Sequence, residues 1–279
     1  MKKLNCELIP MTAISPKLIY IYTPIGQMHV RLYENKGPAL IFLHPMPYSG
    51  SYYDSFCNHL TKESNCSAVS IDMIGYGRSE SIKEPISIHD YATSSIEVIK
   101  TLINDNHISN TANLLGFHTG SAIANEIGIL EPDLINKIIF VTYPFFNQEK
   151  RKEMLSSLSK APLNEDLESL RSMWEFTIEN RAEGVALERA MSNFLDQLQN
   201  LDRGWFGFHA MFNYISEERL PHLKLPTLII NDQSSLTKAT KAASDLISEM
   251  NYIELEGTQG GIFELNIDQI AAHVISFLK

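Results

Sequence analysis

Cysteine is scarce in this sequence, which has three cysteines among 279 residues. Cys6, Cys57 and Cys66 form an odd set, and their spacing matches no metal-ligand pattern. A disulfide framework uses an even set of closely spaced cysteines, and a zinc site uses paired ligands a few residues apart. The pattern argues against both, and we expect free thiols in a reducing, cytoplasmic compartment.

Long apolar runs are also missing. The longest apolar-rich stretch, "LINKIIFVTYPFF", contains Asn136 and Lys137 and falls short of the roughly 18 residues that a membrane span needs. The start of the chain, "MKKLNCELIP", lacks the continuous apolar segment of a secretory signal. We therefore expect no membrane as a partner.

Positive charge is in the minority, and the common cofactor motifs are absent. The formal net charge is −10, which disfavours nucleic acid and anionic membranes as partners. The sequence has no G-x-G-x-x-G, P-loop or metal-ligand motif. We expect a small-molecule substrate, no nucleic acid, and neither cofactor nor metal, while the oligomeric state is left open.

The sequence does contain a regular alternation of strand and helix patterns. Apolar runs rich in isoleucine, valine and tyrosine predict the strands "LIYIYTP", "GQMHVRLYEN", "PALIFLHP", "SAVSIDMIGYG", "TANLLGF", "LINKIIFVTYPFF", "LPTLIIND" and "NYIELEG". Apolar spacing of three and four predicts the helices "SYYDSFCNHLTKES", "IHDYATSSIEVIKTLINDN", "TGSAIANEIGILEP", "LTKATKAASDLISEM" and "NIDQIAAHVISFLK". This order indicates an α/β fold with a mostly parallel twisted sheet flanked by helices.

The alternation stops between residues 147 and 216, where the sequence is helical, charged and aromatic. We predict a helical cap over residues 147–216, inserted into a core made of residues 1–146 and 217–279. A segment inserted between two parallel strands lies over their carboxyl ends. Ligands bind at that edge in open α/β sheets.

Three segments resemble motifs of the α/β-hydrolase superfamily. "LHPMPYSG" is similar to the H-G-x-P loop after its third strand, and "IDMIGYGRSE" matches its D-x-x-G-x-G-x-S turn at Asp72, Gly75, Gly77 and Ser79. "GFHTG" has the G-x-S-x-G spacing of the nucleophile elbow, with His118 in place of the serine. The chain resembles a divergent member over nearly its whole length. We expect the Asp72 turn to be structural.

The resemblance implies three positions for a Ser-His-Asp triad, and at all three this sequence has a different residue. His118 replaces the nucleophile, Ser235 stands where the acid is expected, and Gly260 or Gly261 stands where the histidine is expected. The alternative acid position after the sixth strand offers Asn147. That mechanism needs a nucleophile, a base and an orienting acid. Ordinary serine esterase chemistry is therefore not expected.

The resemblance also implies an oxyanion hole made by the backbone N–H groups of Met46 and Thr119. Pro45 stands where the family usually has glycine, one residue before Met46. A neutral His118 beside two N–H donors suits removal of a proton α to a carbonyl, with the developing enolate held by the donors. Cyclisation, lyase, isomerase or cofactor-free oxygenation chemistry fits, and so does hydrolysis in which His118 activates water or acts as nucleophile.

Further pocket candidates come from the loops and from the cap. The histidine of the "LHPMPYSG" loop is expected to bond the loop backbone, and the cap aromatics to line an apolar roof. Asp232 after the seventh strand and Glu264 lie near the expected acid and base positions, and either carboxylate can pair with His118 or stand in a solvated rim loop. These candidates are His44, Tyr48, Tyr143, Trp205, Phe208, His209 and Asp232.

Three functions stay open on the sequence alone. The first is a cofactor-independent enzyme for a small, largely apolar carbonyl or ester compound, with His118 as base or nucleophile. The second is a catalytically inactive ligand-binding protein that keeps the pocket. The third is a hydrolase whose acid and base come from displaced positions such as Asp232.

Overall fold

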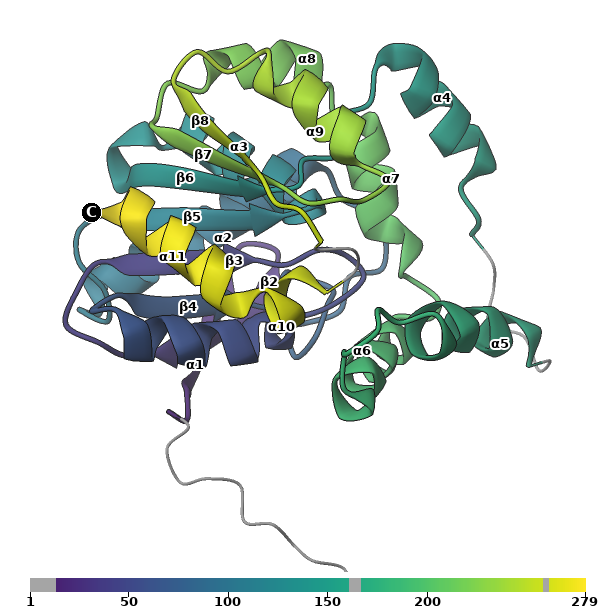
Figure 1. Cartoon of the computed structure of the whole chain (residues 1–279), viewed down its shortest axis with the longest axis horizontal. Coiled ribbons are helices and arrows are strands. Elements are labelled where there is room, and N and C mark those ends of the chain that lie inside the picture. Colours follow the sequence, from purple (N-terminus) through teal and green to yellow (C-terminus); the bar gives the residue numbers. More distant parts are fainter. Residues whose placement is uncertain (1–13, 161–166, 258–260) are drawn as a thin grey trace, which may run out of the picture.

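An eight-stranded sheet forms the centre of the computed structural model, which describes residues 14–160, 167–257 and 261–279 (Figure 1). The strands are β1 (Lys17–Thr23), β2 (Gly26–Tyr33), β3 (Ala39–Leu43), β4 (Ser67–Ile71), β5 (Ala112–Phe117), β6 (Ile135–Val141), β7 (Thr227–Asn231) and β8 (Met250–Glu254). Their order is β1-β2-β4-β3-β5-β6-β7-β8. β2 pairs antiparallel with β1 and β4, and the other neighbours are parallel. The predicted mostly parallel sheet is confirmed, and β1 and β2 form an antiparallel hairpin at its edge.

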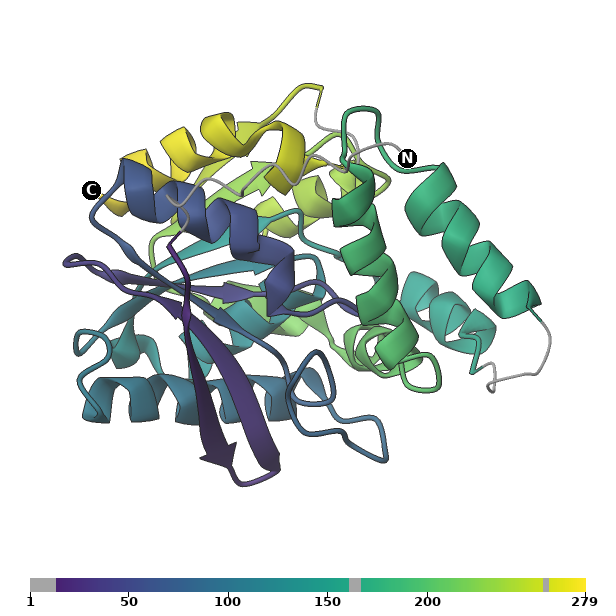
Figure 2. The ribbon, with the colours of Figure 1, turned by 90° about the horizontal axis from the view of Figure 1, so that it is seen from below.

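Helices cover both faces of the sheet (Figure 2). α1 (Asp54–Glu63) and α11 (Ile267–Leu278) pack on one face, whereas α2 (Ile88–Asn104), α3 (Thr119–Leu130) and α9 (Thr237–Ser244) pack on the other. Short helices at the connections are η1 (Gly50–Tyr53), η2 (Pro132–Leu134), α8 (Ser216–Arg219), η4 (Leu220–His222) and α10 (Ile262–Leu265). Because both faces are covered, every residue of β3, β4, β5 and β7 is buried, which explains why apolar residues predominate in their sequences.

The helix predicted over residues 236–250 is shorter than expected. α9 ends at Ser244, and turn hydrogen bonds from the amides of Leu246 and Ile247 follow. The chain reverses there because Met250 already begins β8, the edge strand that pairs with β7. The spacing of apolar residues along 236–250 does not predict that the chain reverses there.

Between β6 and β7 the described residues form helices and no strand. These are α4 (Gln148–Ser157), α5 (Glu168–Trp174), the π-helix η3 (Glu175–Glu179), α6 (Leu187–Gln199) and α7 (Trp205–Asn213), followed by α8 and η4. We call residues 147–216 the insert. Figure 1 shows its helices beside the carboxyl ends of the strands. In the described ranges, no helix is both long and apolar enough to cross a membrane.

A buried carboxylate fixes the loop that leaves β4. Asp72 is fully buried and contacts Nδ1 of His29 at 2.9 Å and Nη1 of Arg31 at 2.6 Å. It also accepts hydrogen bonds of 2.8 Å from the backbone amides of Gly50 and Arg78. Burial opposes its ionisation, but the hydrogen bond from His29 and the charge of Arg31 lower the pKa of Asp72 to about 2.

The same carboxylate explains the glycine and serine of this turn. Gly77 has φ 56°, and a Cβ there would lie 2.5 Å from Oδ2 of Asp72. The hydroxyl of Ser79 donates to the backbone carbonyl of Asp72 at 2.6 Å and accepts from the amide of His29 at 2.9 Å. The segment therefore shapes a turn, as its sequence predicts.

We expect Asp72→Asn to lower the free energy of unfolding by about 3 kcal/mol or more, because the buried Arg31 guanidinium would lose its closest charged partner and keep only Asp54, at 3.7 Å. Urea denaturation near neutral pH measures the change. Asp133→Asn replaces an exposed aspartate outside this network and should change the free energy by less than about 0.5 kcal/mol. Equal effects of the two substitutions would contradict the role given to Asp72.

Candidate active site

His118 stands at the sharp turn between β5 and α3. Its backbone has φ 50° and ψ −119°, a positive-φ conformation that residues with a Cβ rarely adopt. The flanking glycines permit the turn, because a Cβ on Gly116 would overlap the Gly120 carbonyl and a Cβ on Gly120 would overlap the Leu43 carbonyl. Strain of this kind persists only where the surrounding structure enforces it, and it is common at active sites.

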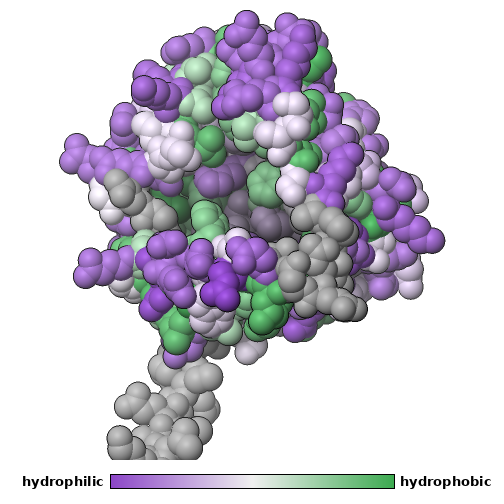
Figure 3. Space-filling model, turned by 90° about the vertical axis from the view of Figure 1, so that its right-hand side faces the viewer, coloured by the Kyte–Doolittle hydropathy of each residue, from purple (hydrophilic) through white to green (hydrophobic). Residues whose placement is uncertain are grey.

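A cavity of about 350 Å³ opens beside His118, between the core and the insert. We call it the His118 cavity. Its core side includes Pro45, Met46, Tyr48, Tyr52, Phe117, Asp232, Ser234, Gly261, Ile262 and Glu264, and its insert side includes Phe176, Thr177, Asn180, Arg181, Ala182, Val185, Ala190 and Asn193. Figure 3 faces this side of the molecule and shows the surface hollowed near its centre.

The imidazole of His118 is held in its neutral form. Its Nε2 is shielded from solvent and has no hydrogen-bond partner among the described residues. Burial lowers the pKa of His118 to about 4, against the opposing attraction of the Asp232 carboxylate. At neutral pH the ring is therefore uncharged, and the buried Nε2 stays without a partner among the described residues.

Asp232 is the carboxylate that accompanies His118 in this cavity. It follows β7, is 3% exposed, and accepts a hydrogen bond of 2.7 Å from the Thr142 hydroxyl. Thr142 follows β6 and has φ 53°, so a second strained residue fixes this carboxylate. No hydrogen bond joins Asp232 directly to His118 in the structure, and their interaction is electrostatic.

The two residues expected to form an oxyanion hole are both buried near this turn. Met46 lines the cavity, and Thr119 begins α3 directly after His118. Within the described residues, no group accepts a hydrogen bond from either backbone N–H. The side chain of Met46 packs against Gly207 of α7, where a Cβ would overlap it, so the loop and the insert are in close contact.

The other sequence candidates are divided between this cavity and the interior. Tyr48 lines the cavity, and burial raises its pKa to about 12. His44 does not line it: Nε2 accepts from the amide of Met73 at 2.9 Å, and Nδ1 contacts the Pro45 carbonyl at 3.1 Å. Tyr143 is fully buried and does not line the cavity, and its hydroxyl lies 3.2 Å from Oγ of Ser216.

The aromatic residues of α7 do not form the roof of the His118 cavity. Trp205, Phe208 and His209 are absent from its lining. Trp205 packs its ring against His209, and Phe208 stacks on Phe212 with 38% of its surface exposed. The reason is that α7 packs on α3 and α4, which leaves the roof to η3 and α6.

The roof is more polar than the sequence suggested. Thr177, Asn180 and Arg181 from η3 and the following turn, together with Asn193 of α6, line it. None of these four residues was predicted from the sequence, because polar residues on a helix are typical of a solvated face. Apolar and polar residues therefore mix on both sides of the cavity, with Asp232 and Glu264 among the core residues and Phe176 and Val185 among those of the insert.

The residues at the predicted triad positions do not all line the His118 cavity. Gly261 lines the cavity and Gly260 lies outside the described residues. Ser234 lines it, whereas Ser235 does not. Asn147 caps α4 by accepting a hydrogen bond of 2.9 Å from the Lys150 amide.

Cys57 and Cys66 are buried free thiols, and Cys6 lies outside the described residues.

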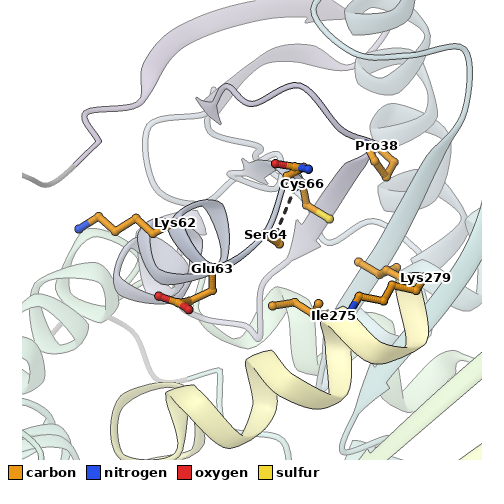
Figure 4. Close-up of a pocket in the computed structure, with 9 residues that line it drawn as sticks. Pro38, Lys62, Glu63, Ser64, Cys66, Ile275 and Lys279 are labelled. Carbon is orange, nitrogen blue, oxygen red and sulfur yellow. Dashed lines mark hydrogen bonds between the residues drawn. The ribbon is translucent and has the colours of Figure 1, made fainter.

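A second pocket, of about 500 Å³, lies at the opposite end of the strands (Figure 4). It surrounds Pro38 and Cys66, which precede β3 and β4, and includes Ile275 and Lys279 at the end of α11. Open α/β sheets bind their ligands at the carboxyl ends of the strands. The His118 cavity is therefore the better candidate for chemistry.

Comparisons with known proteins agree with this architecture. A family model described as the alpha/beta hydrolase fold matches residues 38–246. Curated proteins give no match. The fold is similar to a solved hydrolase from Pseudomonas aeruginosa (TM-score 0.73, 17% identity, 94% of this chain and 98% of that one), to an enol-lactonase from Burkholderia xenovorans (0.70, 16%, 93% and 99%) and to an epoxide hydrolase from Vigna radiata (0.73, 14%, 95% and 98%).

We expect the ring of His118 to stay neutral from about pH 8 down to about pH 5 and to titrate near pH 4, because burial disfavours its charged form. Heteronuclear NMR of the imidazole rings measures this, with His118→Gln identifying the signal. A titration near pH 6.5, the value of a free histidine, would contradict the buried environment.

The same shift has a stability consequence. The folded pKa lies below the unfolded value of about 6.5, so the unfolded chain binds more protons between these values. The contribution of His118 to stability is full above about pH 6.5 and is lost as the pH falls towards 4. His118→Gln should remove this part of the pH dependence in denaturation experiments.

Proposed function

Because the chain belongs to the α/β-hydrolase fold family, we propose that it is a cofactor-independent enzyme for small carbonyl or ester compounds, with His118 as its base or nucleophile. One observation carries the proposal: His118 stands on a strained turn and lines a cavity, and its buried Nε2 has no hydrogen-bond partner among the described residues. Buried polar atoms are nearly always hydrogen-bonded, so an unpartnered one at a cavity calls for a functional reason.

The reaction that suits this geometry begins with a neutral imidazole. Nε2 takes a proton α to the substrate carbonyl, or a proton from an attacking water. Negative charge then develops on the carbonyl oxygen. The free N–H groups of Met46 and Thr119 supply the donors that stabilise this charge, and the start of α3 adds a favourable dipole.

Asp232 supports the charged intermediate state of His118. Once the imidazole has taken a proton, it carries a positive charge in a buried site, and the nearby carboxylate lowers the cost of that charge. The Thr142 hydroxyl keeps Asp232 in place. This arrangement favours His118 acting together with Asp232, a carboxylate displaced from the family's usual acid position. Ser234 lines the same cavity, so a hydrolase with a displaced triad is the alternative.

A second candidate is a ligand-binding protein without catalysis. The observation that favours it is the low pKa of His118, because an imidazole with a pKa near 4 is a weak base at neutral pH. Such a protein would bind its ligand in the same cavity and release it unchanged.

We expect His118→Gln to reduce turnover by at least about 100-fold, the usual contribution of a general acid–base group. Two assays measure it: hydrolysis of 4-nitrophenyl acetate and butyrate, and exchange of the α-protons of small ketones with deuterated water. His222→Gln, an exposed histidine on η4, is the matched control and should keep full activity. Turnover that persists in His118→Gln would overturn the assignment.

We expect a serine-directed fluorophosphonate to leave the wild-type protein unlabelled, because His118 stands where the nucleophilic serine would be. Intact-protein mass spectrometry after incubation reads the result. Covalent labelling of Ser234 would instead favour the displaced triad. Binding of a ligand that stabilises wild type and His118→Gln equally, without conversion, would favour the non-catalytic candidate.

A further inference from the structure

The exposed residues in the lining of the His118 cavity mark the place where the cavity opens. Of its lining residues, Phe176, Asn180 and Arg181 are exposed, and all the others are buried or half-buried. These three residues lie on η3 and on the turn that follows it. The cavity therefore opens to solvent beside residues 176–181, which we call the mouth. A ligand that is too long for the cavity leaves it there.

Phe176 is the apolar residue of the mouth, and it is exposed over 71% of its surface. Among the large apolar residues that the structure describes, only Tyr22 is more exposed. The other exposed apolar residues of the described insert do not line the cavity. They are Leu167, Trp174, Leu187, Leu195, Phe208 and Ile215. Exposed apolar surface and the cavity therefore coincide at Phe176.

The backbone that carries Phe176 is a second unusual feature of the mouth. η3 is a π-helix that directly follows α5, and the amide of Asn180 donates to the carbonyl of Glu175, five residues earlier, at 2.9 Å. A π-helical turn is rare, and such turns frequently occur at functional sites. This observation concerns the main chain, so it is independent of the exposure of the ring.

The neighbours of Phe176 hold it at the mouth. The Thr177 hydroxyl accepts a hydrogen bond of 2.7 Å from Gln197 of α6, and Ile178 is buried against apolar residues of the same helix. Nη1 of Arg181 donates to the Ile178 carbonyl at 2.6 Å. Because both following residues are fixed on α6, Phe176 is pre-organised, and little ordering remains to be done when a ligand arrives.

Apolar residues also line the interior of the cavity on both of its sides. Phe117 and Ile262 belong to the core, and Val185 belongs to the insert. The two sides meet at Gly261, where an added Cβ would lie 3.2 Å from Cγ2 of Val185. An apolar chain that extends from His118 to the mouth therefore has apolar neighbours inside the cavity as well as at its opening.

We propose that Phe176 determines substrate specificity by packing against an alkyl chain of the substrate where this chain leaves the cavity. The substrate class is then an ester or ketone with a medium-length alkyl chain and with its carbonyl group at His118. The cavity volume of about 350 Å³ is at the small end of ligand pockets, so a longer chain reaches the mouth. Removal of the chain and the ring from water favours binding. This inference rests on the proposed function of the same cavity.

We expect the wild-type protein to hydrolyse 4-nitrophenyl octanoate with a kcat/KM about tenfold higher than that of 4-nitrophenyl butyrate, because the added methylene groups bury apolar surface against Phe176. It should also bind 2-octanone about tenfold more tightly than 2-butanone, measured by NMR titration. The ketones test binding without hydrolysis.

Three variants assign this preference for the longer chain. Phe176→Ser should reduce it to less than about threefold, while butyrate turnover and 2-butanone binding change by less than about twofold. Phe176→Leu keeps an apolar side chain and should retain most of the preference. Leu195→Ser removes an apolar side chain of α6 that is 54% exposed and outside the cavity, and it should behave as wild type. Phe176 is exposed, so the urea midpoint should stay unchanged in Phe176→Ser.

The outcomes separate this inference from the proposed function. A ketone preference that is lost in Phe176→Ser, without ester turnover in any variant, supports Phe176 as the specificity residue and counts against the enzyme. Ester turnover without a chain-length preference supports the enzyme and overturns the Phe176 inference.

Four further results would overturn the role of Phe176. They are equal or absent binding of the two ketones, a preference that survives in Phe176→Ser, and a preference that Leu195→Ser also removes. The fourth is a fall in molar mass on Phe176→Ser, measured by light scattering, which would assign the ring to a contact between copies of the chain.

Discussion

Close packing of β5 against the first turn of α3 is the constraint on which the candidate site depends. Gly116 and Gly120 allow backbone to lie against backbone, and the residue between them is forced to positive φ. A side chain in that position is directed to the carboxyl edge of the sheet whatever its chemistry. The fold therefore presents an imidazole where relatives in this family commonly present a serine.

The chemistry of His118 follows from what surrounds it. Burial keeps the ring neutral, and Asp232 moderates that effect without bonding to it. Both strained residues, His118 and Thr142, follow central strands of the sheet. A rigid sheet thus fixes one half of the cavity, while Arg189 and Asp196 fasten the insert that forms the other half.

The fold was largely predictable from the sequence because each element carries its own signal. Apolar-rich runs marked the buried strands, and the Asp72 turn carried its glycines at the required positions. The end of α9 at Ser244 was not predictable, because it is set by the pairing of β8 with β7. The aromatic residues of α7 were assigned to the wrong surface for a similar reason: a helix sequence does not say which neighbour it meets.

The sequence by itself determined the α/β architecture, the tight turn and the identity of His118 at its tip, because these depend on local glycine spacing and apolar periodicity. Only the tertiary structure decided which groups surround that imidazole. Asp232 and Asn193 reach the cavity from β7 and α6, far from His118 along the chain. Their partners, burial and protonation depend on long-range packing, and a linear pattern of residues does not record it.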